Sequence, residues 1–367
     1  MALNINKNMM HLGNVRSVIR ETFEYGNKRA KEIGRENVYD FSLGNPSVPA
    51  PDGVQNTMLN LLKNDNPVKL HGYTSAQGAE VTREKIAQDI NARFNAGVDK
   101  NDIYMTCGAA ASLTISINAL ACDGDEFIAI APFFPEYRVF VEAAGAKFVV
   151  VEADTQKFQI DFDKLKSAIS PKTKAVIINS PNNPTGVVFS EDTIKKLCAI
   201  LKEESEKRNE PIYLIADEPY RELVYDDNTV VPYLTNYYDN TLVCYSYSKS
   251  LSLPGERIGY IVVCNKMEHN KDIYAAVCGA GRALGFVCAP SMMQQVVIEN
   301  LGKTADLSVY KTNRDLLYKS LTEYGYECVK PDGAFYLFVK ALEPDAYKFY
   351  EAAKKYEILV VPCDDFG

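Results

Sequence analysis

Residues 246–259 read Ser-Tyr-Ser-Lys-Ser-Leu-Ser-Leu-Pro-Gly-Glu-Arg-Ile-Gly, and this stretch decides how the rest of the chain is interpreted. It places the amine of Lys249 three residues after Ser246 and eight before Arg257. Pyridoxal 5′-phosphate needs a lysine for its Schiff base, and hydroxyl and guanidinium groups for its phosphate. A lone Ser-x-Ser-Lys is more often an exposed lysine in a serine-rich turn. The continuation through Pro-Gly-x-Arg-Ile-Gly favours the cofactor site instead.

Composition limits the class of protein. The chain has 367 residues, of which 47% are hydrophobic and 24% charged, as in an ordinary globular protein with a large core and two domains. A net charge of -8 argues against nucleic-acid binding, which usually shows as a basic excess. No apolar run approaches membrane-spanning length and no secretory signal begins the chain, so we expect no membrane partner.

Cysteines and histidines indicate the compartment and the chemistry. The nine cysteines form no Cys-x-x-Cys pair and lie mostly in apolar runs, which is typical of reduced core residues in a cytoplasmic protein. The three histidines, at positions 11, 71 and 269, have no metal-ligand spacing. We therefore expect a cytoplasmic protein whose chemistry needs no metal.

Short β-branched runs alternate with longer amphipathic stretches between about Asp102 and Tyr260, which is typical of a parallel sheet wrapped by helices. We predict an α/β fold with a mostly parallel, seven-stranded sheet in its large domain. In such sheets ligands bind at the carboxyl ends of the strands, so the loops there should converge on one site. The predicted strands are 103–106, 126–130, 147–151, 175–179, 212–216, 242–245 and 258–263, and the predicted helices include 112–121, 135–144 and 190–207.

Both ends of the chain predict a second, smaller α+β domain. The first forty residues are typical of helix and loop, and helical patterns after Met292 give way to short predicted strands at 327–329, 335–339 and 358–361. We predict an N-terminal part of the small domain at 1–45, a large cofactor-binding domain at 46–291 and a C-terminal part of the small domain at 292–367.

Two of the loops carry polar residues suited to a pyridine ring. Asn183, in the run Asn-Asn-Pro-Thr-Gly, lies in a tight loop that can aim one amide inward. Asp217 ends a hydrophobic strand, where a carboxylate must be paired, and a protonated pyridine nitrogen would be such a partner. Tyr220 would then bond the ring oxygen beside the imine. A plain surface turn for Asn183, and a helix cap or a buried arginine pair for Asp217, are the alternatives.

Two other loops suit a phosphate and a ring face. Residues 106–112, Thr-Cys-Gly-Ala-Ala-Ala-Ser, pass from a predicted strand into a helix, where backbone amides can close on a phosphate. Residues 131–137, Ala-Pro-Phe-Phe-Pro-Glu-Tyr, supply aromatic rings that can stack on pyridine. We choose Phe134 over Phe133 for this role, with core packing as the fate of the other ring.

These motifs occur in an order that resembles the class I and II aminotransferases, the fold-type-I pyridoxal-phosphate enzymes typified by aspartate aminotransferase. The resemblance covers nearly the whole chain, and its lysine motif is among the more specific in enzymes that use this cofactor. It rests on Gly44-Asn45-Pro46, Tyr73 with Gly78, Gly108-Ala109-Ala110, Phe134, Asn183 through Gly186, Asp217-x-x-Tyr220 and Ser246-x-x-Lys249 through Arg257.

The resemblance implies a role for each matching residue. Lys249 is the Schiff-base lysine, Asp217 pairs with the pyridine nitrogen, and Tyr220 bonds the ring oxygen. In the implied homodimer, Tyr73 reaches the phosphate of the partner's cofactor. The implied cofactor set is Tyr73, Gly108, Ala109, Ala110, Phe134, Asn183, Asp217, Tyr220, Ser246, Lys249 and Arg257, and the implied substrate set is Gly44, Asn183 and Arg282.

The implied activity is transamination in amino acid metabolism. An amino acid displaces Lys249, the freed amine moves the α-proton, and hydrolysis leaves a 2-oxo acid; a second 2-oxo acid then runs these steps backwards. A lowered pKa of Lys249 makes it a usable base near neutral pH. Arg282 lies about where aspartate aminotransferases place a partner-subunit arginine for a dicarboxylate, which implies an aspartate-like substrate.

One departure from the family pattern concerns the C-terminal segment. Family members continue past the Val-Val-Pro-x-x-x-Phe-Gly segment at 360–367 to an arginine that binds the substrate's α-carboxylate. Either the sequence is truncated there or the α-carboxylate is held by other residues. We favour truncation, because the apolar run 358–361 should be followed by further small-domain structure.

Two other readings remain open. A carbon–sulfur β-lyase of the same fold would use identical cofactor residues, and release of pyruvate and ammonia from cystathionine without a 2-oxo acid acceptor would identify it. A non-catalytic regulatory domain that binds pyridoxal phosphate is the other alternative. The absence of a DNA-binding domain and of a basic patch counts against it, as does retention of the proton-transfer lysine.

Overall fold

The computed structural model describes residues 4–14, 17–152 and 154–367, which form two compact units. One unit is built from 1–45, 324–327 and 339–365, and the larger one from 46–323, 328–338 and 366–367. Both ends of the chain therefore contribute to the smaller unit. Where independent domains begin and end stays a prediction.

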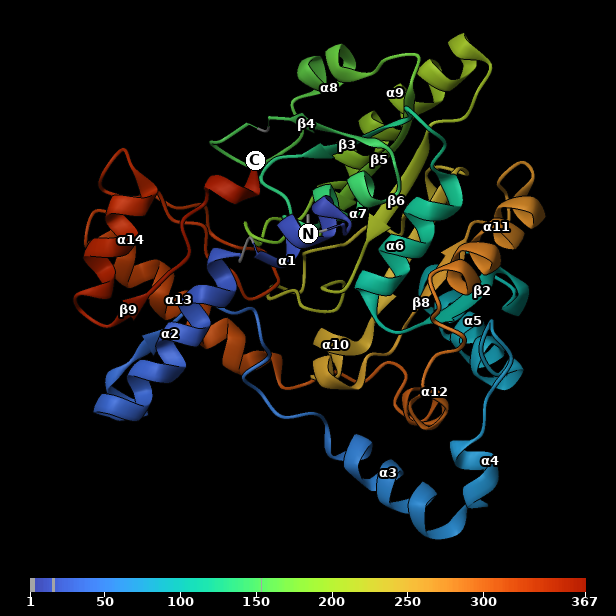
Figure 1. The fold of residues 1–367 in the computed structure, drawn as a ribbon, viewed down its shortest axis with the longest axis horizontal. Coiled ribbons are helices and arrows are strands. Elements are labelled where there is room, and N and C mark those ends of the chain that lie inside the picture. The colour runs from blue at the N-terminus through green and yellow to red at the C-terminus, as the bar shows by residue number, and fades with distance from the viewer. Residues whose placement is uncertain (1–3, 15–16, 153) are drawn as a thin grey trace. The chain divides into compact units, whose positions relative to one another are not determined.

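The larger unit contains a seven-stranded sheet, so the predicted fold class is confirmed (Figure 1). Strand β8 pairs antiparallel with both of its neighbours, and the other neighbouring strands pair in parallel. The predicted strand ends differ from the observed ones by at most two residues. The strand order is β2 (Ile103–Thr106), β8 (Gly259–Val263), β7 (Thr241–Ser246), β6 (Tyr213–Asp217), β5 (Thr173–Asn179), β3 (Glu126–Ile130) and β4 (Lys147–Val151).

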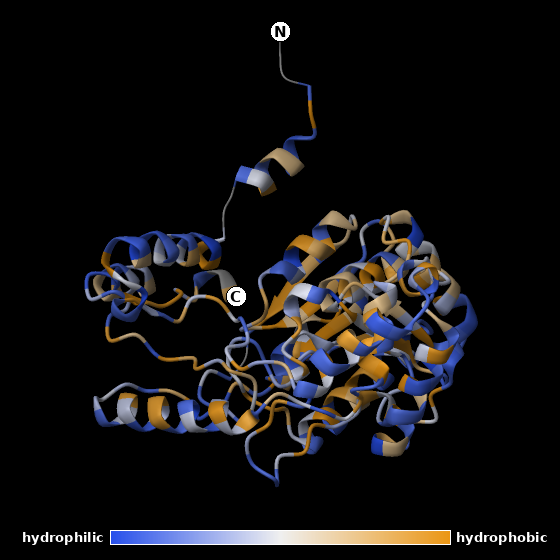
Figure 2. Cartoon of the chain, turned by 90° about the horizontal axis from the view of Figure 1, so that it is seen from below, coloured by the Kyte–Doolittle hydropathy of each residue, from blue (hydrophilic) through white to orange (hydrophobic). Residues whose placement is uncertain are grey.

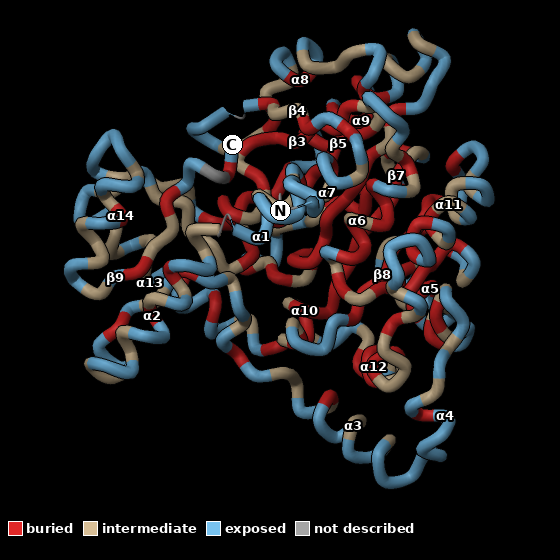
Figure 3. The backbone as a smooth tube through the Cα atoms, in the orientation of Figure 1, coloured by how far each residue is buried: buried red, intermediate tan, exposed pale blue. Residues whose placement is uncertain are grey.

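Both faces of this sheet are covered, which explains why its strands are apolar at nearly every position. Alternate residues point to opposite faces, so Val176 and Leu214 join one buried cluster while Ala175 and Ile215 join another. In Figure 3 the strands at the centre of the larger unit are coloured as buried. Figure 2 shows the same strands in the colours of hydrophobic residues and many of the surrounding helical turns in those of hydrophilic ones.

Each helix of the larger unit buries at least one residue. Helix α9 begins after Ser190, whose side chain accepts a hydrogen bond from the amide of Thr193 at 3.1 Å and so caps the helix. The helices are α3 (Asp52–Asn64), α4 (Pro67–His71), α5 (Glu80–Phe94), α6 (Ala109–Leu120), α7 (Glu136–Ala143), α8 (Phe162–Ala168), α9 (Glu191–Arg208), α10 (Tyr247–Ser250), α11 (Asn270–Ala283), α12 (Ser291–Ile298) and α13 (Leu307–Glu323).

The smaller unit pairs a two-residue strand near each end of the chain, β1 (Tyr39–Asp40) with β9 (Ile358–Leu359), in parallel. Its helices are α1 (Lys7–Asn14), α2 (Val18–Ile33) and α14 (Ala346–Lys354). The hydroxyls of Thr22 in α2 and Tyr350 in α14 lie 3.0 Å apart in the interior. Among the described residues, no helix combines the length and the apolar character needed to cross a bilayer.

Two strands predicted near the C-terminus are wrong. Residues 327–329 and 335–339 form no strand of either sheet. For residues 335–339 the preceding segment shows why, because the amides of Gly333 and Ala334 donate to the carbonyls of Gly186 and Leu223, which lie in loops of the larger unit. Residues 327–329 meet 339–340 only briefly, through a bond of 2.9 Å from the amide of Lys340 to the carbonyl of Glu327, which is too short a pairing for a strand. An apolar run indicates burial and does not say whether the partner is a strand or a loop.

Two glycines in α11 give a matched test of its packing. A Cβ at Gly281 would overlap the buried ring of Tyr104 on β2, whereas a Cβ at Gly279 would meet nothing within 4 Å. We expect Gly281→Ala to destabilise the protein by about 1–3 kcal/mol through overpacking. Gly279→Ala should stabilise it by up to about 1 kcal/mol through helix propensity. Urea unfolding of both variants checks this, and equal midpoints would contradict the described packing of α11.

Candidate active site

The carboxylate of Asp217 lies at the carboxyl end of β6 and is buried, with 5% of the residue exposed. Tyr137, from α7, donates a hydrogen bond of 2.5 Å to its Oδ2. Its Oδ1 has no hydrogen-bond partner among the described residues, although it is fully shielded from solvent. A buried oxygen in this condition costs free energy until a donor reaches it.

Burial raises the pKa of Asp217 to about 7; the bond from Tyr137 opposes the shift and the nearby carboxylate of Glu218 adds to it. Glu218 itself forms a buried ion pair of 2.5 Å with Arg221. The predicted alternative of a buried arginine pair thus describes Glu218 and not Asp217. A cationic N–H donor that reached Oδ1 would satisfy the oxygen and favour the ionised carboxylate.

Asn179, the last residue of β5, links the Asp217 strand to the Asn183 loop. Its side-chain nitrogen donates to the backbone carbonyl of Asp217 at 2.7 Å. Its side-chain oxygen accepts from the backbone amide of Asn183 at 2.6 Å. This loop is tight, as the sequence predicts, and the side chain of Asn183 is half-buried.

Lys249 and Tyr220 lie near one another after the carboxyl ends of the neighbouring strands β7 and β6. Lys249 lies in the one-turn helix α10, directly after β7. Its amine is 5.9 Å from the ring centre of Tyr220 and 5.2 Å from that of Phe335. Burial lowers the pKa of Lys249 to about 8, and the positive charge of Arg257 lowers it further in the same direction.

A cationic cradle forms where α6 begins. Gly108 precedes α6 with a φ of 88°, and a Cβ there would lie 2.8 Å from Nη2 of Arg257. The guanidinium therefore lies against the turn whose next residues, Ala109 and Ala110, present the first amides of the helix. Nη1 of Arg257 also lies 3.5 Å from Oγ of Ser248. A helix N-terminus beside a guanidinium is suited to a phosphate.

Ser246 closes the other side of this cradle. Its Oγ is 2.7 Å from Oγ of Ser248 and accepts a hydrogen bond from the Ser248 amide at 3.1 Å. Gly259 on β8 pairs with both Ser246 and Thr106, and a Cβ there would lie 3.2 Å from the Cα atoms of Gly108 and Ser246. Glycine at 259 thus allows the two phosphate-binding turns to approach one another.

Phe133 and Phe134 have different environments. Phe133 is buried and packs edge-on against Phe148 at a centroid distance of 5.0 Å. Phe134 is half-buried and meets the ring of Tyr137, the partner of Asp217, at 5.7 Å. Phe133 also contacts Tyr137, at 6.5 Å, so the two rings differ mainly in burial. The core packing expected for the other ring is observed for Phe133, and stacking by Phe134 stays a prediction.

The contacts described above do not test the roles predicted for Tyr73, Arg282 and Gly44. Tyr73 follows α4 and is 90% exposed. Arg282, near the end of α11, is also exposed. Gly44 belongs to the smaller unit. Roles for Tyr73 and Arg282 in a partner subunit's site, and for Gly44 in substrate binding, stay predictions.

Other residues that contact the site were not identified from the sequence. Tyr137 is the last residue of the run 131–137, three residues after Phe134 and at the start of a predicted helix. This helical spacing indicates that the two side chains lie near one another. Ser248 stood inside the lysine motif. Asn179 ended a predicted strand, and Phe335 and Tyr336 fell in the wrongly predicted strand.

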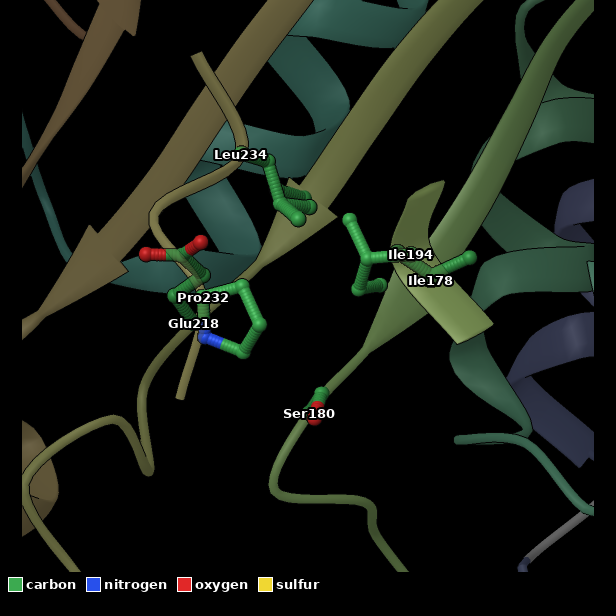
Figure 4. A pocket seen from close by; sticks show the side chains of 7 residues that line it. Ile178, Ser180, Ile194, Glu218, Pro232 and Leu234 are labelled. Carbon is green, nitrogen blue, oxygen red and sulfur yellow. The ribbon is translucent and has the colours of Figure 1, made fainter. Parts of the chain in front are cut away.

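A separate small pocket lies beside the same strands but contains none of the predicted site residues (Figure 4). Its lining is largely apolar, from Ile178, Ile194 and Leu234, with Glu218 and Pro232 at one side. The Glu218 carboxylate in this lining is already paired with Arg221.

The arrangement fits pyridoxal 5′-phosphate on three independent features. The unpaired Oδ1 of Asp217 can accept from a protonated ring nitrogen. The cradle of Gly108 and Arg257 can hold the phosphate. Lys249 supplies an amine whose pKa of about 8 leaves a reactive neutral fraction near neutral pH.

Comparison with known proteins gives a consistent result. The pattern of the family "Aminotransferase class I and II" matches residues 36–367. A probable aspartate aminotransferase of Methanocaldococcus jannaschii is 30% identical over 366 residues, covering 96% of this chain and 89% of its own length. An aspartate aminotransferase of Thermotoga maritima is 30% identical over 354 residues, with coverages of 95% and 89%. The crystal structure of an amino transferase from Eubacterium rectale matches with a TM-score of 0.97 and 58% identity, covering all of this chain and 92% of that one.

The raised pKa of Asp217 predicts how the stability of the cofactor-free protein depends on pH. The folded state keeps a proton that the unfolded state loses near pH 3.8, so stability falls as pH rises from there to about 7. Between pH 5 and pH 8 we expect Asp217→Asn to gain on the order of 2–3 kcal/mol relative to the wild type. Urea unfolding at both pH values measures this difference.

The exposed residue Asp227 provides the control, since Asp227→Asn removes a carboxylate at the surface. Its stability is measured at pH 5 and pH 8 in the same way, as the reference for loss of an exposed carboxylate. If the stability of Asp217→Asn relative to the wild type changes between pH 5 and pH 8 no more than that of Asp227→Asn, the conclusion that Asp217 has a buried oxygen without a partner is wrong.

Proposed function

Because the chain belongs to the class I and II aminotransferase family, we propose that Lys249, Asp217 and Tyr220 carry its chemistry. The protein is a pyridoxal-phosphate-dependent aminotransferase that moves an amino group between an amino acid and a 2-oxo acid. When bound, the cofactor supplies an electron sink for the bond that breaks at the amino acid's α-carbon. The observation that best supports the residue assignment is the buried, unpaired Oδ1 of Asp217.

Lys249 acts as the proton carrier. Its pKa of about 8 results first from burial and second from the charge of Arg257. An amine with an ordinary lysine pKa would be almost entirely protonated near neutral pH and would be a poor base. The lowered pKa lets Lys249 accept a proton from the α-carbon and return it to a neighbouring atom.

Asp217 and Arg257 orient the ligand by its two ends. The ionised carboxylate of Asp217 accepts from the ring nitrogen and keeps it protonated, while Tyr137 holds the other carboxylate oxygen in place. Arg257, Ser246, Ser248 and the first amides of α6 hold the phosphate. Phe134 covers a ring face, and Asn183 and Tyr220 bond the ring oxygen.

We propose aspartate as the amino donor, in keeping with the names of the relatives from M. jannaschii and T. maritima. We also propose a cytoplasmic homodimer. The 90% exposure of Tyr73 and the exposed side chains of Leu59, Leu62 and Val68 on α3 and α4 support an interface there. In such a dimer, Tyr73 contacts the phosphate of the partner's cofactor and the exposed Arg282 binds the second carboxylate of a dicarboxylic substrate.

Borohydride reduction of the protein loaded with pyridoxal 5′-phosphate tests the lysine assignment. Reduction should fix the cofactor on the peptide that contains Lys249, as read by mass spectrometry. Lys249→Ala should lose the label and at least about 10³-fold of the turnover, because both the covalent link and the proton carrier are removed. A label on another lysine in the wild type would refute the assignment.

The same preparation identifies the reaction and the donor. Each of aspartate, alanine and cystathionine is added without a 2-oxo acid, and loss of the bound aldehyde's visible absorbance marks amino transfer. Aspartate should react fastest, and Arg282→Ala should lower the ratio of the aspartate rate to the alanine rate in this half-reaction. An unchanged ratio would exclude Arg282 from specificity, and release of pyruvate and ammonia from cystathionine would instead indicate the β-lyase.

A further inference from the structure

The segment 331–336 is bound to both loops that carry the ring-oxygen ligands. The amides of Asp332 and Gly333 each donate to the carbonyl of Gly186, in the Asn183 loop, at 2.9 Å. On the other side, the amide of Ala334 donates to the carbonyl of Leu223 at 2.8 Å, close to Tyr220. A Cβ at Gly186 would collide with this segment, so the approach depends on glycine there.

Tyr336, in this segment, meets Tyr220 directly. Their hydroxyl oxygens are 2.6 Å apart and their rings are perpendicular, with centroids 5.5 Å apart. Phe335 contacts the ring of Tyr220 edge-on at 5.8 Å. Tyr336 thus provides a hydrogen-bond partner for the hydroxyl of Tyr220, and the rings of Phe335 and Tyr336 pack against its ring.

The number of hydroxyl hydrogens determines which tyrosine donates in the bond between Tyr220 and Tyr336 when the cofactor is bound. A tyrosine hydroxyl has one hydrogen to donate and lone pairs to accept with. If Tyr220 donates its hydrogen to the ring oxygen of the cofactor, it can only accept from Tyr336, and Tyr336 must be the donor. Burial keeps both hydroxyls protonated, since it raises the pKa of Tyr336 to about 12 and that of Tyr220 well above its usual value.

We propose that Tyr336 is a positioning residue of the cofactor site: by donating to Tyr220, it aims and polarises the hydroxyl that Tyr220 presents to the cofactor's ring oxygen. The proposal rests on the proposed role of Tyr220. A donor that is itself an acceptor of a hydrogen bond becomes a stronger donor. The Tyr336 bond thereby lowers the electron density on the ring oxygen and the proton affinity of the nitrogen that Lys249 contributes.

Other charged groups near Tyr220 also influence protonation in the site. The amine of Lys249 lies over its ring, and the charge of Asp217 is close enough to raise the pKa of both tyrosines. Arg257 lowers the pKa of Lys249. None of these charges is altered by a change at Tyr336 that removes only a hydroxyl.

Tyr336→Phe in the loaded enzyme tests the proposal through the colour of the bound cofactor. The visible absorbance of pyridoxal 5′-phosphate bound to lysine changes with protonation of their shared nitrogen. We expect the pH midpoint of this change to rise by about 0.5 unit in the variant, a threefold gain in proton affinity. A midpoint equal to that of the wild type would overturn the proposal.

Tyr225→Phe is the matched control. Tyr225 is buried, and its hydroxyl donates to the carbonyl of Ala334, so it anchors the same segment without touching Tyr220. If Tyr336 serves only to hold the segment, both variants should shift the midpoint alike, which would contradict the proposal. A shift in Tyr336→Phe alone supports it.

The spectrum also separates this proposal from the residue roles on which it depends. Tyr220→Phe should raise the midpoint further than Tyr336→Phe, and Tyr336→Phe should add nothing in a Tyr220→Phe background. If Tyr220→Phe leaves the midpoint unchanged, the assigned role of Tyr220 is wrong and Tyr336 has nothing to position. If Tyr220→Phe shifts it and Tyr336→Phe does not, the proposal for Tyr336 alone fails.

Discussion

The site depends on one buried carboxylate oxygen that the protein leaves without a partner. Oδ2 of Asp217 accepts from Tyr137, which fixes the carboxylate plane, while Oδ1 has no donor among the described residues. Such an oxygen destabilises the empty protein and raises the pKa of Asp217 to about 7. A ligand with a cationic N–H recovers this free energy on binding. A protonated pyridine is therefore bound in preference to a ligand that has no N–H to donate to Oδ1.

A single guanidinium connects the phosphate end of the site to its reactive end. Arg257 lies against Gly108 at the start of α6 and also lowers the pKa of Lys249. The short motif that joins Lys249 to Arg257 spans α10 and the turn into β8, and β8 runs back antiparallel beside β7. The reversal of this strand brings the lysine and the arginine to the same edge of the sheet. Because β8 runs antiparallel to β7, Arg257 can both bind the phosphate and lower the pKa of Lys249.

The sequence was sufficient for the sheet and for the loops at its carboxyl edge. Every predicted strand of the large sheet is observed. Asp217 ends β6, Tyr220 follows that strand, and Lys249 follows the neighbouring strand β7, as local patterns indicated. The supporting contacts could not be read in this way. Tyr336 reaches Tyr220 from 116 residues further along the chain. Its segment hydrogen-bonds to loops, so the apolar run that contains it wrongly predicted a strand. Tyr137 and Ser248 were visible as residues, but their roles depend on distances that spacing alone does not give.

The central claim, that Asp217 keeps the pyridine nitrogen protonated, can be measured on the nitrogen itself. The direct experiment is the ¹⁵N chemical shift of ring-labelled pyridoxal 5′-phosphate bound to the wild-type protein, followed through the neutral pH range. The account predicts the shift of a protonated ring nitrogen that stays constant across the range, because the ion pair with buried Asp217 opposes loss of the proton. A ring nitrogen that titrates as in the free cofactor, or that is unprotonated throughout, would contradict it.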